Sequence, residues 1–242
     1  MKTSNKILLG TLAFIMLVFT AIHVALYAKY KKGEFVTVAQ LHEEKYEKHI
    51  LNGVTKVDAW GINNLEIIPS DTFKIELAKD FGKETKITYE QKGDVLVVKG
   101  GATDINSSTG KKEVYRSYSP VTIYLPSNTT ITVADCEIRL NGAKDTLKAF
   151  THIINAKNTD VTFGEWHRDD KGYSYFSNIN LTSNGGRVEF LKGASFKEIN
   201  ISLTDNEVND QGFKADKIVL NADDKSNITL KGTNLKKVIN KQ

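Results

Sequence analysis

The segment Asn-Ile-Asn-Leu at residues 178–181 recurs twice further along the chain, as Glu-Ile-Asn-Ile at 198–201 and as Lys-Ile-Val-Leu at 217–220. The step between copies is about 20 residues, and self-similarity at a fixed period of this length is the sequence signature of a stacked-repeat architecture. A segment that returns in the same phase predicts that equivalent residues lie above one another in successive units.

A second apolar position keeps the same step, at Val188, Val208 and Ile228. The apolar pieces of each repeat are too short for helices, and Gly, Asn, Asp, Ser and Lys separate them. Two short strands and two turns per unit predict an all-β fold, a parallel β-solenoid (single-stranded β-helix-like) whose coils stack about 4.8 Å apart.

We expect residues 178–238 to form three stacked coils. Val188, Val208 and Ile228 are expected to form one inward column. A second inward column should contain Ile179, Ile199 and Ile218. An antiparallel meander is the alternative, because its strands also recur at regular spacing. A meander has no reason to bring back the same residues in the same phase, so the repeats favour the solenoid.

The composition is that of a folded domain with a solubilising surface. Charged residues make up 26% of the 242 residues, the net charge is +4, and both signs are interspersed through the polar part. This distribution lacks the basic stripe that nucleic-acid binding requires, so no nucleic-acid partner is expected. The single cysteine, Cys136, excludes an intrachain disulfide. Its alternation with Ala134, Ile138 and Leu140 predicts a buried core thiol rather than a nucleophile.

Residues 7–28 form an apolar run without a formal charge. At about 1.5 Å per residue such a helix spans the hydrocarbon core of a bilayer, about 30 Å thick. A cleaved signal peptide is the rival interpretation, but its apolar region is shorter and ends in a small-x-small site. Here the run ends in Leu26-Tyr27-Ala28, with a bulky leucine where a small residue is needed. An uncleaved single-pass transmembrane helix is therefore predicted.

The charges that flank the helix leave its orientation open. Lys2, Lys6 and the amino terminus stand on one side, and Lys29, Lys31 and Lys32 stand on the other. The two sides carry equal numbers of positive charges, so the positive-inside rule does not decide the orientation. The chain is expected to divide into three parts: a membrane anchor with a short cytoplasmic start at 1–33, a polar spacer or short helix at 34–53, and a β-solenoid head at 54–242.

Other patterns within the head predict individual elements. Residues 73–77 and 121–125 alternate apolar with polar side chains, as half-buried strands do, and Lys92-Gly93-Asp94 is typical of a hairpin turn. Asn180 and Asn200 occupy equivalent positions of successive repeats, where stacked asparagines can hydrogen-bond in a ladder.

Two polar excursions interrupt the strands, at residues 103–116 and 165–175. Only the second combines aromatic with charged side chains, and aromatic residues and arginine are the types that anchor interfaces. Its members form the predicted partner-binding loop: Trp166, His167, Arg168, Asp169, Asp170, Tyr173 and Tyr175. Under the alternative interpretation it is a charged loop tip, with Trp166 capping the apolar column of the first regular repeat.

No catalytic, metal-binding or cofactor-binding residues are predicted. His167 and Asp169 could contribute metal ligands, but a tight site needs three or four converging ligands, and no second His, Cys or carboxylate motif has complementary spacing. The neighbouring carboxylates Asp169 and Asp170 need not face one cleft, as acid/base chemistry requires. The sequence also contains no nucleophile elbow, zincin motif or phosphate-cradling glycine loop.

The order of the parts resembles the auto-transporter adhesins with a head GIN domain, envelope proteins common in Bacteroidetes. The resemblance covers residues 54–239 and rests on the opening at 54–67, which includes Gly61-Ile62-Asn63, on residues 73–77, and on the Asn- and Gly-punctuated repeats. It implies a β-solenoid head outside the cytoplasm, in the periplasm or at the cell surface, and no enzymatic activity. The family has no agreed catalytic residues, so none are assigned here.

Two functional hypotheses follow. The first is a non-enzymatic, membrane-anchored envelope protein that binds an envelope protein or a glycan, or serves as a structural module, since solenoids expose long flat faces. The second is a carbohydrate-active enzyme, a polysaccharide lyase or hydrolase on a parallel β-helix. Such an enzyme needs acidic residues clustered at repeat spacing, and the repeats lack them. A cytoplasmic signalling role is disfavoured, because only about six residues precede the predicted helix.

Overall fold

The computed structural model describes residues 3–34, 45–79, 87–100, 120–165 and 173–240. The chain divides into two compact units, Met1–Lys45 and Tyr46–Gln242. The first unit holds one long helix and the second holds a β-domain.

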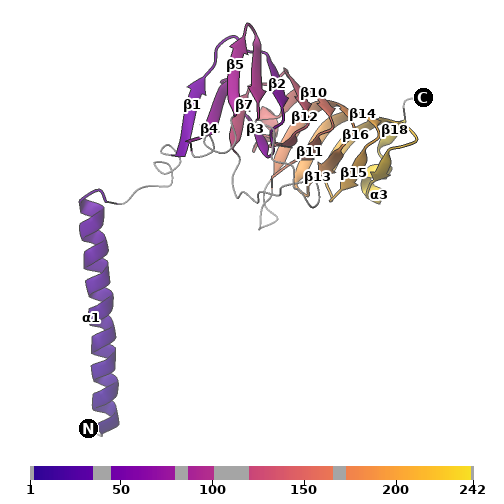
Figure 1. The fold of residues 1–242 in the computed structure, drawn as a ribbon. Helices are drawn as coiled ribbons and strands as arrows, with labels where there is room; N and C mark the ends of the chain where they lie inside the picture. The colour runs from indigo at the N-terminus through magenta and orange to yellow at the C-terminus, as the bar shows by residue number, and fades with distance from the viewer. Residues whose placement is uncertain (1–2, 35–44, 80–86, 101–119, 166–172, 241–242) are drawn as a thin grey trace, which may run out of the picture. The chain divides into compact units, whose positions relative to one another are not determined.

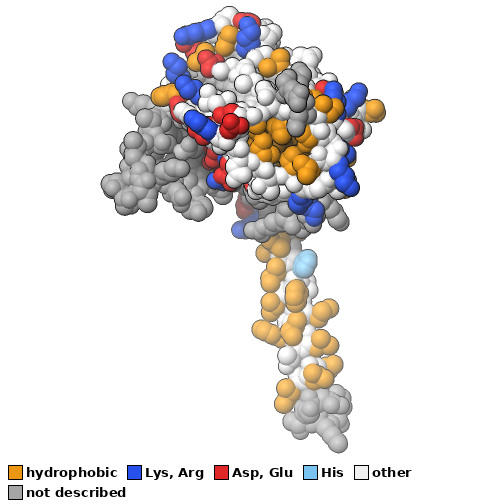
Figure 2. Space-filling model, turned by 90° about the vertical axis from the view of Figure 1, so that its right-hand side faces the viewer, with side chains coloured by type: hydrophobic (Ala, Val, Ile, Leu, Met, Phe, Trp, Pro, Cys, Tyr) orange, Lys and Arg blue, Asp and Glu red, His pale blue; other side chains and the backbone are white. Residues whose placement is uncertain are grey.

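The helix of the first unit, α1, covers Thr3–Lys31 and contains the apolar segment predicted at residues 7–28. Its apolar part, Lys6–Lys31, is 26 residues long and reaches a mean hydropathy of 2.4, and none of the residues in its apolar window is buried. Figure 2 shows hydrophobic side chains along this helix. By length and composition α1 can cross a membrane, and a signal sequence near the N-terminus would have the same properties.

The β-domain contains two sheets of nine strands each. Sheet A has the order β1 (Tyr46–Ile50), β4 (Lys74–Ala78), β7 (Val121–Leu125), β3 (Leu65–Pro69), β9 (Glu137–Leu140), β11 (Asp160–Phe163), β13 (Arg187–Phe190), β15 (Glu207–Asp210) and β17 (Asn227–Thr229). Sheet B has the order β18 (Val238–Asn240), β16 (Lys214–Ala222), β14 (Ala194–Thr204), β12 (Ser174–Asn184), β10 (Phe150–Lys157), β8 (Thr129–Ala134), β2 (Lys56–Trp60), β6 (Val95–Lys99) and β5 (Thr88–Lys92).

One strand of each sheet makes one coil, and from β8 onward the coils follow one another toward the C-terminal end (Figure 1). The domain is a parallel β-solenoid of about five turns. This confirms the fold class predicted from the repeats. It also excludes the antiparallel meander for these coils, because their strands pair in parallel.

Both predicted inward columns are confirmed. In sheet B, Ile199 is in register with Ile179 on one side and Ile218 on the other, and all three side chains are buried. In sheet A, the column is Val188, Val208 and Ile228, of which the first two are buried and the last is half-buried. On the outward face, Asn200 Nδ2 donates to Asn180 Oδ1 at 2.9 Å, so the expected asparagine ladder forms.

The core between the sheets is filled by aromatic rings that continue from coil to coil. Phe163 stacks on Phe190 with ring centroids 5.2 Å apart, and Phe176 stacks on Phe196 at 4.8 Å. The two stacks meet edge to face, as aromatic pairs prefer. Phe213 extends the packing into the next coil.

The N-terminal end of the solenoid departs from sequential stacking. The coil formed by β2 and β3 lies between the coil of β6 and β7 and the coil of β8 and β9, although β6 and β7 come later in the chain than β3. Antiparallel strands close this end: β5 pairs with β6 in the predicted hairpin, β4 pairs with β7, and β1 pairs with β4.

Strand β1 corrects one expectation. Residues 34–53 were predicted to be a polar spacer or short helix, from the helical spacing of Glu44 and Lys48. Within that range Tyr46–Ile50 is instead a strand that pairs with β4 over its whole length, from Tyr46 opposite Ala78 to Ile50 opposite Lys74. Pairing with a distant strand overrides the local helical preference.

The coils have two corners. At the first corner the chain passes from sheet B to sheet A, and the residue that opens the turn has a positive φ: Gly61, Asp135, Asn158, Gly185 and Asp205. Glycine, Asn and Asp tolerate this left-handed conformation better than other residues. The N–H of each of the first four donates to the next coil, for example Asp135 N to Lys157 O at 3.0 Å. At the second corner the chain returns from sheet A to sheet B, through longer connections.

Cys136 lies directly after the first-corner turn and is 6% exposed. Its Sγ is 3.1 Å from Ala134 O, and burial raises the pKa of the thiol. The residue is a core thiol, as the alternation in its sequence predicted.

The C-terminal end of the solenoid shows a patch of hydrophobic side chains with lysines near its border (Figure 2). Leu220, Ile228, Leu230 and Val238 pack against the core there but remain half-buried. The short helix α3 (Gly232–Leu235) lies between β17 and β18, the last described strands of the two sheets.

Candidate functional site

The candidate site is the second corner around the predicted partner-binding loop. Trp166, His167, Arg168, Asp169 and Asp170 lie outside the described residues, as does the other predicted excursion, 103–116. The structure does describe both ends of the loop, Glu165 and Tyr173, together with Tyr175 in β12.

The two tyrosines of the prediction are brought together. The rings of Tyr173 and Tyr175 stack with centroids 5.9 Å apart and planes 13° from parallel. Tyr173 is 50% exposed, and Tyr175 is half-buried. The stacked pair therefore presents an aromatic surface to solvent where the chain enters β12.

A second segment, residues 141–149 between β9 and β10, is fixed against this pair. Ala143 and Tyr175 exchange both backbone hydrogen bonds, at 3.0 and 2.9 Å. Gly142 makes this approach possible, because a Cβ there would lie 2.5 Å from backbone atoms of Ser174 and Tyr175. The Lys144 ammonium pairs with the Glu165 carboxylate, which ties the segment to the start of the loop.

The same segment carries an exposed turn. Its short 3₁₀ helix, η2 (Thr146–Lys148), begins at Asp145, whose side chain accepts a hydrogen bond from Leu147 N at 3.0 Å. Leu147 is 92% exposed. An apolar side chain that is held outward on a capped turn is available for contact with a partner.

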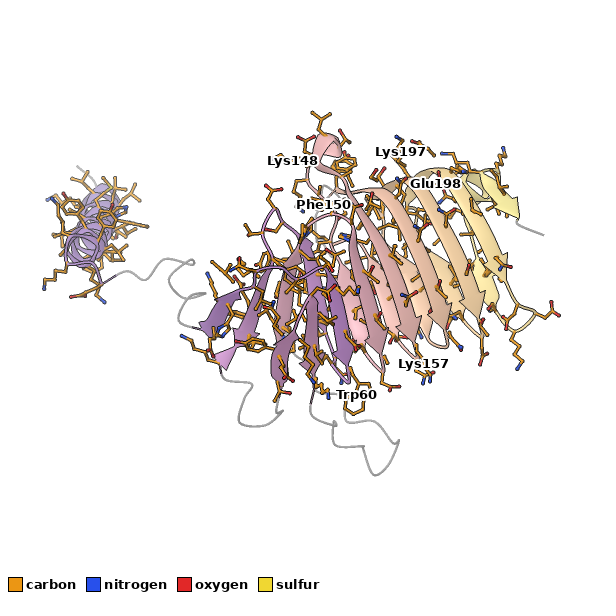
Figure 3. The ribbon with its side chains drawn as sticks, turned by 90° about the horizontal axis from the view of Figure 1, so that it is seen from above. Trp60, Lys148, Phe150, Lys157, Lys197 and Glu198 are labelled. Atoms are coloured by element: carbon orange, nitrogen blue, oxygen red, sulfur yellow. The ribbon has the colours of Figure 1, made fainter. Side chains whose placement is uncertain are left out.

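A shallow hollow of about 330 Å³ lies beside η2. Connections after β3, after β7 and before β10 line it: Ser70, Asp71, Pro126, Ser127, Lys148, Ala149 and Phe150. Thr151 N donates to Ser127 Oγ at 2.9 Å, which joins two of these connections. Figure 3 shows Lys148 and Phe150 near η2, at this end of the strands of sheet B.

The charged groups of the hollow suit binding better than proton transfer. Its lining contains one carboxylate, Asp71, and one ammonium, Lys148, rather than the paired carboxylates of glycoside hydrolysis. Among the described residues, no three His, Cys, Asp or Glu side chains gather as a metal site would need.

Sequence reasoning missed His152, which lies in β10 near the hollow. The imidazole stacks on Phe150 at 6.2 Å and is 3% exposed, and its Nδ1 has no hydrogen-bond partner among the described residues. Burial lowers the pKa of His152 to about 4, so the ring is neutral at pH 7. An alternating pattern in Thr151-His152-Ile153-Ile154 was the only available signal, and it does not show which residues face inward.

No family model matches the chain, and no curated protein matches it. Among solved structures, a candidate adhesin from Parabacteroides merdae has a TM-score of 0.35 and 12% identity, over 76% of this chain and 80% of that one. A candidate cell adhesion protein from Clostridium sporogenes has a TM-score of 0.26 and 11% identity, over 77% and 99%. A candidate lipid-binding protein from Parabacteroides distasonis has a TM-score of 0.30 and 11% identity, over 74% and 78%. TM-scores and identities this low carry no functional argument, so the functional proposal rests on the features of the chain itself.

Proposed function

We propose that this chain is a non-enzymatic binding protein of the bacterial cell envelope, anchored in the membrane by α1 and carrying its β-solenoid head outside the cytoplasm. The observation that carries the proposal is an apolar helix of 26 residues, none of which is buried, in a chain whose solenoid exposes aromatic and charged side chains of neighbouring segments at the second corner.

The anchor part of the proposal rests on the chemistry of α1. Hydrophobic side chains that stay exposed within their own unit need an apolar environment, and a bilayer supplies it. Tyr27 and Tyr30 suit the headgroup level, with Lys29 and Lys31 beside them. The absence of a small-x-small site after the apolar run favours retention of the helix. The side of the membrane follows from the resemblance to envelope proteins.

The binding part rests on the second corner. Leu147 and Tyr173 expose apolar surface on neighbouring segments, while Lys144, Glu165 and Lys148 supply charge around them. An apolar centre with a polar rim is the usual anatomy of an interface. Loops held on a rigid scaffold are also where binding residues concentrate.

Retention and sidedness are tested in one experiment on the full chain in its native cells. Mass spectrometry of the purified membrane protein should find α1 present, and an N-terminus at Lys29 or beyond would overturn the anchor. A Ser202→Cys variant places a thiol on the exposed face of β14. A membrane-impermeant maleimide should label it in intact spheroplasts, whereas the unsubstituted chain, whose only cysteine is buried, should stay unlabelled.

The docking loop is tested by Trp166→Ala. Loss of the cross-linked envelope partner at an unchanged melting temperature is the expected result. A melting temperature lowered by several degrees with binding intact would make Trp166 a core residue, and the loop would no longer be a docking site. Lys225→Ala, at an exposed residue near the C-terminal end, is the control that should change neither quantity.

A further inference from the structure

The outward face of sheet B carries an exposed tryptophan. Trp60 ends β2 and is 47% exposed. Large aromatic side chains normally bury most of their surface, so an indole left this open is a feature to be accounted for. Figure 3 shows Trp60 and Lys157 at one end of the strands of sheet B, opposite the end with Lys148 and Phe150.

Hydrogen bonds fix the orientation of this indole. Trp60 Nε1 donates to Asp135 Oδ2 at 3.1 Å, and Asp135 Oδ1 accepts from Asn158 Nδ2 at 3.3 Å. Asp135 and Asn158 are themselves held by the positive-φ turns of the first corner. The ring is therefore oriented before any ligand arrives, which reduces the entropy lost on binding.

The strand register places hydrogen-bonding side chains beside the ring. Asp58, Thr132 and Asn155 are successive register partners on β2, β8 and β10, and all three are exposed. Trp60, Ala134 and Lys157 form the neighbouring row, with the small Ala134 between the two large side chains. Rows of one face lie about 7 Å apart and neighbouring strands about 4.8 Å apart, so the six residues cover an area of one to two sugar rings.

We propose that these six residues, the Trp60 face, bind carbohydrate, with a pyranose ring stacked on the indole. A pyranose has one apolar C–H face and a rim of hydroxyl groups. The indole matches the apolar face, and the carboxylate of Asp58, the hydroxyl of Thr132, the amide of Asn155 and the ammonium of Lys157 match hydroxyl groups as acceptors and donors. The Trp60 face is separate from the second-corner loops, and the proposal does not depend on the anchor.

Other classes of ligand fit this chemistry less well. An extended peptide would add to a free strand edge, but β2, β8 and β10 are each paired on both sides. A polyanion would require a basic surface, whereas Asp58 and Asp135 offset Lys157 and Lys99 around the ring. A protein partner would require a larger apolar centre than one indole.

The test uses the full-length chain in lipid nanodiscs, in a Trp166→Phe background that leaves Trp60 as the sole tryptophan. Cellohexaose, mannohexaose, chitohexaose and hexagalacturonate are titrated to about 10 mM, with indole fluorescence and calorimetry as readouts. At least one of these probes should quench or shift the Trp60 emission and saturate. In the calorimeter, Trp60→Ala should weaken its affinity by about tenfold or more.

Ile239→Ala is the matched control, because Ile239 in β18 is an apolar residue of nearly the same exposure, 52%, outside both proposed binding surfaces, and it should leave sugar affinity unchanged. If Trp60→Ala fails to fold, Asp58→Ala replaces it. Asp58 is exposed and has no hydrogen-bond partner among the described residues, so its loss should weaken binding about threefold or more without lowering the melting temperature. The proposal is overturned if no probe saturates, if Trp60→Ala and Asp58→Ala both bind as tightly as the parent, or if Trp60 mediates self-association instead.

Discussion

Ile199 lies at the centre of the inward isoleucine column, with Ile179 on one side and Ile218 on the other. Its side chain has no exposed surface. We expect Ile199→Ala to lower the free energy of unfolding by about 2–5 kcal/mol, because a cavity between rigid coils cannot collapse. Urea denaturation of the variant measures this, with Ser202→Ala on the outward face of the same strand as the control. A loss as small as that of the control would mean that the column does not carry the core.

At His152, burial produces a dependence of stability on pH. The folded-state pKa is lowered from 6.5 to about 4, so between these values the unfolded state binds a proton that the folded state does not. The free energy of unfolding therefore rises with pH across this window, and the stabilising contribution of neutral His152 is complete above pH 6.5. The difference is on the order of 3 kcal/mol. Urea denaturation at pH 4.5 and 7.5 should show a smaller difference for His152→Gln than for the unsubstituted chain; equal differences would refute it.

Among the elements, one buried carboxylate links the C-terminal segment to β15. Asp210 at the end of β15 is 4% exposed and accepts four hydrogen bonds. Oδ1 accepts from the backbone of Gly212 and Phe213, and Oδ2 accepts from Lys231 N at 2.9 Å and Asn234 Nδ2 at 2.8 Å. The first two bonds shape the turn into β16, and the last two attach α3.

We expect Asp210→Ala to cost about 3 kcal/mol or more, since four donors lose a charged acceptor. Hydrogen exchange should show the earliest loss of protection at residues 230–240. Asp224→Ala, at an exposed residue for which no hydrogen bond is observed, is the control and should leave protection unchanged. Protection retained at 230–240 in Asp210→Ala would show that α3 is attached by other contacts.

The elements also show what the sequence could predict. The column of Ile179, Ile199 and Ile218 was predictable because each coil repeats the environment of the last, so the period appears in the residues themselves. Strand β1 was not, because its partner β4 lies about 28 residues away and the local spacing favours a helix. The hairpin at Gly93 was predictable, but the position of β2 between β6 and β8 depends on contacts that leave no local pattern.

In the candidate site too, contacts between residues close in the sequence were predictable and contacts between distant segments were not. Tyr173 and Tyr175 are two residues apart, at the point where the chain enters β12, and sequence spacing was enough to group them. The pairing of Lys144 with Glu165 and the orientation of Trp60 by Asp135 join segments on different coils. Such contacts are set by the coil register, which the irregular spacing of the N-terminal half does not reveal.

For the whole head, the two ends should differ in cooperativity. Toward the C-terminal end each coil pairs only with the coils that precede and follow it in the sequence. Strand β3 instead lies between β7 and β9, so the coils at the N-terminal end are not stacked in chain order. We expect Leu65→Asp, at a buried residue of β3, to abolish hydrogen-exchange protection throughout β2 to β11. The matched variant Ile218→Asp should lose protection only in β16 to β18. Equal, global loss in both variants would show a single cooperative unit.

The interleaved first coils also determine how the head would respond to a pulling force. A load applied at the C-terminal end can peel off one coil at a time, each releasing about 20 residues, or about 70 Å of chain. The coil of β2 and β3 cannot be peeled in this way, since it is paired on one side with β6 and β7 and on the other with β8 and β9, and both of these coils come later in the chain. Optical-tweezer traces should therefore show several small steps followed by one larger rupture at higher force; a single rupture would contradict this picture. A head built in this way yields gradually at its far end while the part that bears Trp60 stays intact.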